Sequence, residues 1–205
     1  DEGDEAIYPN PGFPIYESVI RFAGAKPVPL RLREESNWAF DPDELDRLIT
    51  PRTKVLVLNS PHNPTGGVLS SAALDRVAAA ARKHSFSILS DEIYSRLVYD
   101  GEARSIASYP GLKDRTIILD GFSKTYAMTG WRLGYGVMET SLAKHVARLM
   151  TNCNSCTATF VQRAGIAALQ GSQAPVEAMV EEFRVRRDRL VAGLNELPGV
   201  SCRMP

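Results

Sequence analysis

The stretch Lys54-Val55-Leu56-Val57-Leu58-Asn59 decides the fold class. Its four central residues are all apolar, with no polar residue alternating between them, so both faces of the strand must be covered. Strands of this kind are typical of parallel sheets that carry helices on both sides. The sequence therefore predicts an α/β protein, a three-layer α/β/α sandwich with a mostly parallel sheet.

Further strands and helices alternate outward from this stretch. Apolar runs predict strands over residues 6–8, 28–32, 87–90, 116–119 and 133–137. Pro29 cannot donate a ladder hydrogen bond, which marks its strand as an edge strand. Amphipathic windows predict helices over residues 16–23, 142–149, 160–169 and 175–197. A further helix is expected to carry the apolar stripe Leu74, Val77, Ala78 and Ala81, and another should begin at Asp41 as N-cap, followed by Pro42.

Composition excludes several classes of protein. The 205 residues include 24 basic and 24 acidic side chains, so no net field attracts nucleic acid or an anionic membrane. No apolar run approaches the roughly 18 residues of a membrane span, and three cysteines make no disulfide framework. A cytoplasmic protein is expected. The chain starts just before a strand and stops just after an apolar step, which suggests a piece of a longer polypeptide.

Polar side chains gather where predicted strands give way to loops, at Asn63, Asp91 and Lys124. In open α/β sheets the ligand binds at this edge, beyond the carboxyl ends of the strands. A partly desolvated lysine there becomes a usable amine nucleophile. Ser123 beside it and Arg132 eight residues on suit a phosphate. On spacing alone, a surface lysine on a glycine-containing loop fits equally well.

Two other segments have plain alternatives too. Asp91 ends an apolar strand and Tyr94 lies three residues on, yet Asp91 alone fits a helix N-cap better. Asn63 can donate its amide to a ligand, or simply belong to a connecting turn. The peptide bonds Asn63-Pro64 and Asn10-Pro11 are candidates for the cis form.

In this order, three motifs make the chain resemble the fold-type I pyridoxal 5′-phosphate (PLP)-dependent aminotransferases of class I/II, particularly the bacterial aspartate aminotransferase-like branch. They are Pro61-His62-Asn63-Pro64-Thr65-Gly66, Asp91-Glu92-Ile93-Tyr94, and Ser123-Lys124 through Gly130-Trp131-Arg132-Leu133-Gly134. The similarity also covers residues 3–24 and runs along nearly the whole chain. It implies that residues 1–173 form the PLP-binding large domain, incomplete here, and residues 174–205 the interdomain helix and the start of the small C-terminal domain.

The resemblance implies a role for each matching residue. Lys124 would form the Schiff base with PLP and then move the substrate proton. Asp91 would pair with the pyridine nitrogen and keep it protonated. Tyr94 and Asn63 would hydrogen-bond the phenolic oxygen of the cofactor. These roles suit the use of PLP as an electron sink.

The remaining implied roles concern the phosphate and the ring. Arg132, with Ser123, would bind the phosphate, and Phe13 matches the aromatic residue that stacks on the ring. Gly121 stands where some relatives have a phosphate-binding serine. A Ser/Gly-rich phosphate loop, a substrate-clamping arginine and a partner-donated tyrosine have no counterpart in the chain, so it is expected to bind PLP weakly and to be inactive alone.

The expected reaction is amino transfer between an amino acid, aspartate-like or other, and a 2-oxo acid, in a homodimer when full length. Alternatives are a PLP-dependent C–S lyase or related eliminating enzyme, the effector domain of a transcription regulator, and a non-catalytic relative. Cys153 and Cys156 form a C-x-x-C without a second pair, so no metal site is expected.

Overall fold

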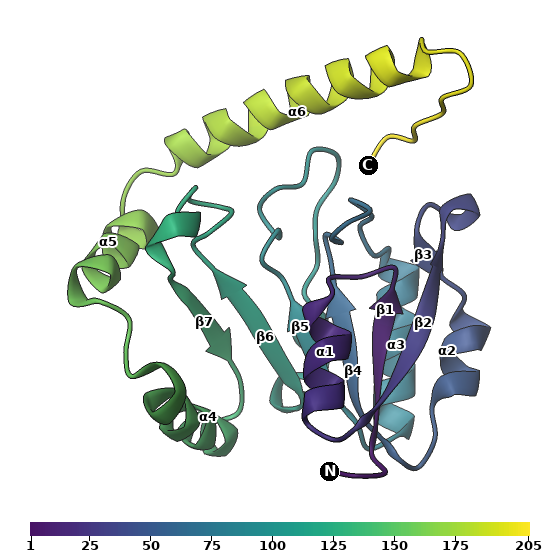
Figure 1. The fold of residues 1–205 in the computed structure, drawn as a ribbon, viewed down its shortest axis with the longest axis vertical. Coiled ribbons are helices and arrows are strands. Elements are labelled where there is room, and N and C mark those ends of the chain that lie inside the picture. Colours follow the sequence, from purple (N-terminus) through teal and green to yellow (C-terminus); the bar gives the residue numbers. More distant parts are fainter.

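A seven-stranded sheet organises the computed structural model, which describes residues 1–205 (Figure 1). In spatial order the strands are β3 (Ala39–Phe40), β2 (Lys26–Arg33), β1 (Glu5–Asn10), β4 (Thr53–Asn59), β5 (Ser87–Asp91), β6 (Thr116–Gly121) and β7 (Gly134–Val137). The five central strands pair in parallel, and only the two outer strands, β3 and β7, are antiparallel. The expected mostly parallel sheet is confirmed.

Helices cover both faces of this sheet. They are α1 (Ile15–Phe22), α2 (Pro42–Leu48), α3 (Ser71–Lys83), α4 (Thr140–Asn154), α5 (Thr159–Gln170) and α6 (Ala174–Asn195). Short 3-10 turns are η1 (Glu34–Ser36), η2 (Ile106–Ser108), η3 (Lys113–Arg115) and η4 (Thr129–Trp131). One buried cluster joins α2 and α3 to the sheet, and a second, on the opposite face, joins α1 to it. This is the three-layer sandwich that the sequence predicts.

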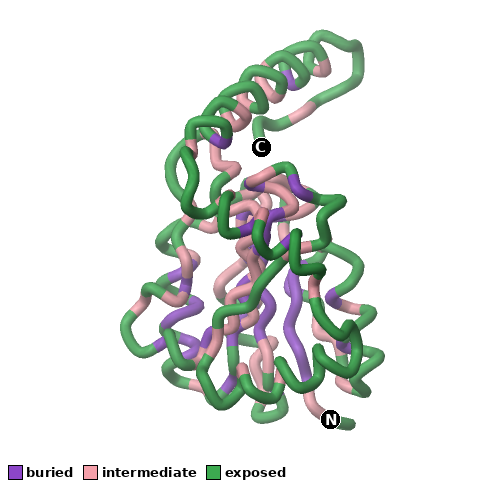
Figure 2. The backbone as a smooth tube through the Cα atoms, turned by 90° about the vertical axis from the view of Figure 1, so that its left-hand side faces the viewer, coloured by how far each residue is buried: buried purple, intermediate pink, exposed green.

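Strand β4 shows why an uninterrupted apolar run belongs at the centre. Leu56 and Leu58 are buried in the α2–α3 cluster, whereas Val57 between them is buried under α1. Side chains of a strand alternate between faces, so a strand covered on both faces needs apolar residues throughout. The buried positions follow the sheet in the burial view (Figure 2).

The prediction of an edge strand around Pro29 needs a correction. Strand β2 is the second strand, because β3 pairs antiparallel with its end at Leu32 and Arg33. β3 has only two residues, too few to show an alternating pattern. Pro29 lies outside that pairing and pairs only with β1, so its missing N–H leaves no gap in a ladder with β3.

Local signals predicted the helix starts and turns well. The Asp41 carboxylate accepts from the Asp43 backbone N–H at 2.9 Å, with Pro42 in the first turn, as expected for the N-cap of α2. The Asn10-Pro11 and Asn63-Pro64 peptide bonds are cis, and Ser60-Pro61, which was not anticipated, is cis too.

Helix α6 runs across the end of the sheet toward which the parallel strands point (Figure 1). Only Val176 and Val191 of its residues are buried, so most of its length is solvated, as its charged face predicts. Whether residues 174–205 belong to a second domain remains a prediction. None of the helices combines the length and apolarity needed to cross a bilayer.

Candidate cofactor-binding site

The polar residues singled out in the sequence lie at one edge of the sheet. Asn59 at the end of β4 pairs in register with Asp91 at the end of β5, and Asp91 lies opposite Leu119 of β6. Lys124 follows β6 five residues after Leu119. Parallel strands bring their carboxyl ends to one edge, so the loops carrying Asn63, Asp91 and Lys124 leave the sheet side by side.

Asp91 is held by two donors. The Tyr16 hydroxyl donates to its Oδ2 at 2.5 Å, and the Ile93 backbone N–H donates to its Oδ1 at 3.2 Å. Burial of the Tyr16 ring, and then the neighbouring Asp91 carboxylate, raise the pKa of Tyr16, so the phenol stays protonated and remains a donor. An ionised carboxylate has about four acceptor positions, so Asp91 can accept a further donor.

Sequence reasoning missed Tyr16. The sequence pattern indicates only that Tyr16 starts a helix, yet its side chain is 6% exposed and reaches from α1 to the end of β5. The one available signal was local. Tyr16 lies three residues after Phe13, the residue that the family resemblance places against the cofactor ring. The two rings meet edge to face, with centroids 6.0 Å apart, and Phe13 itself is 45% exposed.

Asn63 is tied to Asp91 through a second asparagine. The backbone N–H of Asn63 donates to the Asn59 side-chain oxygen at 2.9 Å, and the Asn59 amide donates to the Asp91 carbonyl at 3.1 Å. The Asn63 carboxamide makes no hydrogen bond within the chain and can therefore serve a ligand. The loop after β4 is thus fixed to the end of β5.

Lys124 lies over an aromatic ring. Its Nζ is 5.5 Å from the centroid of the Tyr94 ring, and it forms no ion pair. A cation placed over a ring face gains about 0.5–1 kcal/mol at an exposed site. The Lys124 amine therefore has an aromatic neighbour but no carboxylate partner within the chain.

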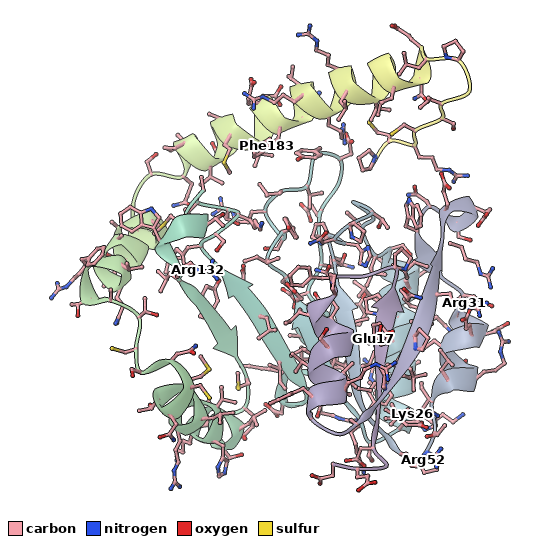
Figure 3. The ribbon with its side chains drawn as sticks, viewed as in Figure 1. Glu17, Lys26, Arg31, Arg52, Arg132 and Phe183 are labelled. Atoms are coloured by element: carbon pink, nitrogen blue, oxygen red, sulfur yellow. The ribbon has the colours of Figure 1, made fainter.

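Arg132 is linked to the loop that carries Lys124 by two hydrogen bonds through Thr129. The Thr129 hydroxyl donates to the Ser123 carbonyl at 2.8 Å, and Arg132 Nη1 donates to the Thr129 carbonyl at 2.9 Å. Arg132 adopts a left-handed backbone conformation, with φ of 57°, at the end of η4. Figure 3 shows it beside the upper end of β6 and β7. Its other guanidinium donors are unused within the chain and suit an anion.

Gly121 cannot gain a side chain without movement of a neighbouring strand. An added Cβ would lie 2.9 Å from Gly134 Cα and 3.0 Å from the Leu133 carbonyl oxygen. Both obstacles are backbone atoms of the segment that pairs with β6. The serine that some relatives place here would therefore require β7 to shift.

Comparison with known proteins agrees with this geometry. A family model described as "Aminotransferase class I and II" matches residues 1–205. The chain belongs to this family.

Individual members of the family are similar along nearly the whole chain. An aspartate aminotransferase from Musicola paradisiaca (strain Ech703) is 39% identical over 204 residues, which is 99% of this chain and 51% of the relative. An arginine–pyruvate transaminase from Pseudomonas aeruginosa is 40% identical over 203 residues, 99% of this chain and 52% of the relative. The chain thus spans about half the length of these relatives.

Solved structures give the same result for the fold. An aspartate aminotransferase from Rhizobium meliloti superposes with a TM-score of 0.95 at 38% identity, covering 100% of this chain and 52% of that one. The predicted family and fold class are confirmed.

Proposed function

We propose that the polypeptide containing this chain is a PLP-dependent aminotransferase, which moves an amino group between an amino acid and a 2-oxo acid. The observation that carries the proposal is the position of the Lys124 amine over Tyr94, at the same sheet edge as the Asp91 carboxylate. Family membership supports the reaction class.

The donor set fits PLP in its chemistry. Asp91 keeps room for a ring N–H beside its two existing donors. Arg132 has guanidinium donors to spare for a phosphate, and the Ser123 hydroxyl has no hydrogen-bond partner within the chain. Asn63 and Tyr94 offer donors for the phenolic oxygen, and Phe13 offers an exposed ring surface. Bound PLP supplies an electron sink for the electrons released at the substrate Cα.

The residues of the chain then have distinct tasks. Lys124 would hold the cofactor through its Nζ and, when that amine is free, would act as the base and acid that moves the proton to and from the substrate Cα. Asp91, oriented by the Tyr16 hydrogen bond, would pair with a protonated ring nitrogen. Asn63 and Tyr94 stabilise negative charge on the phenolic oxygen. Arg132 and Ser123 would bind the phosphate and so help to orient the cofactor.

Several narrower expectations stay predictions. The relatives include enzymes named for aspartate and for arginine with pyruvate, so similarity alone does not select the amino acid for this chain. We also propose a homodimer and a cytoplasmic location, both on the basis of the family resemblance.

The proposal is tested by turnover of the complete polypeptide with PLP. A panel of amino-acid donors with 2-oxoglutarate or pyruvate should yield the 2-oxo acid of the donor and the amino acid of the acceptor in equal amounts. Lys124→Ala should lose this turnover by at least about a thousandfold. Lys113→Ala, a lysine on the η3 turn away from the site, should retain it.

Product identity separates the alternatives. Release of ammonia or sulfide without formation of a new amino acid would replace amino transfer by elimination. Equal turnover by Lys124→Ala and the unaltered polypeptide would refute the assignment of Lys124 itself.

A further inference from the structure

His62 immediately precedes the asparagine assigned to the cofactor, and it organises the whole turn. Its backbone N–H donates to the Gly67 carbonyl, and its carbonyl accepts from the Gly66 N–H, both at 2.8 Å. Its side-chain Nδ1 lies 2.8 Å from the Thr65 hydroxyl oxygen, which also accepts from the Gly67 N–H at 3.3 Å. Backbone and side chain together close residues 62–67 into one unit.

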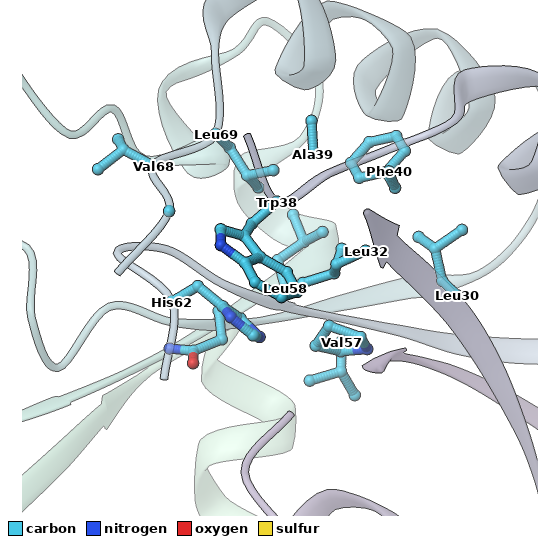
Figure 4. A pocket seen from close by; sticks show the side chains of 13 residues that line it. Leu30, Leu32, Trp38, Ala39, Phe40, Val57, Leu58, His62, Val68 and Leu69 are labelled. Carbon is cyan, nitrogen blue, oxygen red and sulfur yellow. The ribbon is translucent and has the colours of Figure 1, made fainter. Parts of the chain in front are cut away.

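The imidazole is buried in apolar surroundings. His62 is 7% exposed and faces a cavity of about 30 Å³ beside the ends of β2, β3 and β4 (Figure 4). The apolar side chains that line this cavity include Leu32, Trp38, Val57 and Leu58. Burial lowers the pKa of His62 to about 4, so the ring is neutral at pH 7.

One ring nitrogen has no hydrogen-bond partner within the chain. Nε2 is buried and has no hydrogen-bond partner. A buried polar atom without a partner destabilises the folded state, and an apolar side chain of similar shape would avoid this penalty. The other nitrogen, Nδ1, carries the only side-chain hydrogen bond of His62, and that bond ends on the turn that holds Asn63.

Asn63 is therefore fixed from two sides. On one side its backbone N–H bonds to Asn59, which is itself bonded to Asp91. On the other side the His62–Thr65 bond holds the turn in shape. The Asn63 carboxamide, which has no partner within the chain, depends on these two anchors for its position.

We propose that His62 is a positioning residue of the cofactor site: its imidazole, bonded to Thr65, holds the 62–67 turn so that the Asn63 carboxamide meets the phenolic oxygen of PLP. This inference rests on the proposed function and adds a residue outside the set that contacts the cofactor. The two ring nitrogens have different roles in this inference, because only Nδ1 bonds to the turn.

The test is a pH titration of the visible absorption of PLP bound to the complete polypeptide. Asn63 stabilises the anionic phenolic oxygen, so Asn63→Ala should raise the midpoint of this titration by about one pH unit. His62→Leu and Thr65→Val, which remove the bond and leave Asn63 in place, should raise it in the same direction by about half as much. His62→Asn, which can keep a polar atom near the Nδ1 position, should stay close to the unaltered midpoint.

A double variant shows whether His62 acts through Asn63. His62→Leu combined with Asn63→Ala should titrate like Asn63→Ala alone, because coupled residues give non-additive effects. In the cofactor-free protein, the Gly66 and Gly67 amides should exchange hydrogen faster in Thr65→Val than in the unaltered chain.

Opposite outcomes would overturn the inference. Midpoints for His62→Leu and Thr65→Val that match the unaltered polypeptide, while Asn63→Ala shifts, would reduce His62 to a packing residue. Additive shifts in the double variant would mean that it acts independently of Asn63. A polypeptide that binds no PLP at Lys124 would refute the proposed function instead, which keeps the two failures distinct.

Discussion

Replacing Tyr16 with phenylalanine tests the link that fixes Asp91. The substitution keeps the buried ring and removes only the hydroxyl that donates to Asp91 Oδ2 at 2.5 Å. The carboxylate lies in a partly buried position and keeps a single protein donor, the Ile93 N–H. Hydrogen bonds to charged groups contribute about 1.5–3 kcal/mol, so Tyr16→Phe should lower the free energy of unfolding by about that amount.

The chain contains a matched control. Tyr8 is also buried, at 8% exposed, and also donates to a carboxylate, that of Glu17, at 3.0 Å. The Glu17 side chain is 43% exposed and retains its pair with Arg21, so water replaces the lost donor. Tyr8→Phe should therefore lower the free energy of unfolding by less than about 1 kcal/mol.

Urea unfolding followed by circular dichroism measures both variants. With a slope of about 2 kcal/mol per molar urea, the midpoint of Tyr16→Phe should fall by roughly 1 M and that of Tyr8→Phe by well under 0.5 M. Equal losses in the two variants, or no loss in Tyr16→Phe, would refute the view that Tyr16 satisfies a partly buried charge.

Three further substitutions test other parts of the structure. Glu5 is 3% exposed and accepts a hydrogen bond from the Thr50 hydroxyl at 2.6 Å, which is the main reason why its pKa lies below the usual value. The stability that Glu5 contributes should therefore be complete above about pH 4.5 and lost as the pH falls through the lowered pKa. In an acid titration of the free energy of unfolding, Glu5→Gln should lose less stability over this range than the unaltered chain. Gly121→Ala should destabilise the fold by about 1–3 kcal/mol in urea unfolding, because the new Cβ meets backbone 2.9 Å away; an unchanged midpoint would show that β7 yields freely. Arg115→Met should lower the melting temperature and reduce the free energy of unfolding by about 2–4 kcal/mol, because the guanidinium donates to carbonyls at the end of α3, including that of His84 at 2.6 Å. An unchanged melting temperature would show that water replaces the lost donors.

Signals contained in a few neighbouring residues could be predicted from the sequence. The double-sided apolar pattern of β4 indicated a parallel sheet, and Asp41 with Pro42 indicated a helix start, because both depend on local chemistry. The Asn63, Asp91 and Lys124 loops were expected at one edge because parallel strands share direction.

Contacts between distant residues could not be predicted in this way. Tyr16 and Asp91 are 75 residues apart, and no local pattern pairs them. The sequence places His62 in a turn, where polar residues are mostly exposed. Its burial depends on β2 and β3, which pack beside the turn only in the folded chain.

The most direct measurement of the central claim is borohydride reduction of the complete polypeptide after incubation with PLP, followed by peptide mass mapping. The prediction is one reduced cofactor per chain, attached to Lys124 and absent from Lys124→Ala. Label spread over surface lysines, or attached stoichiometrically to another lysine, would contradict the assignment of this sheet edge as the cofactor site.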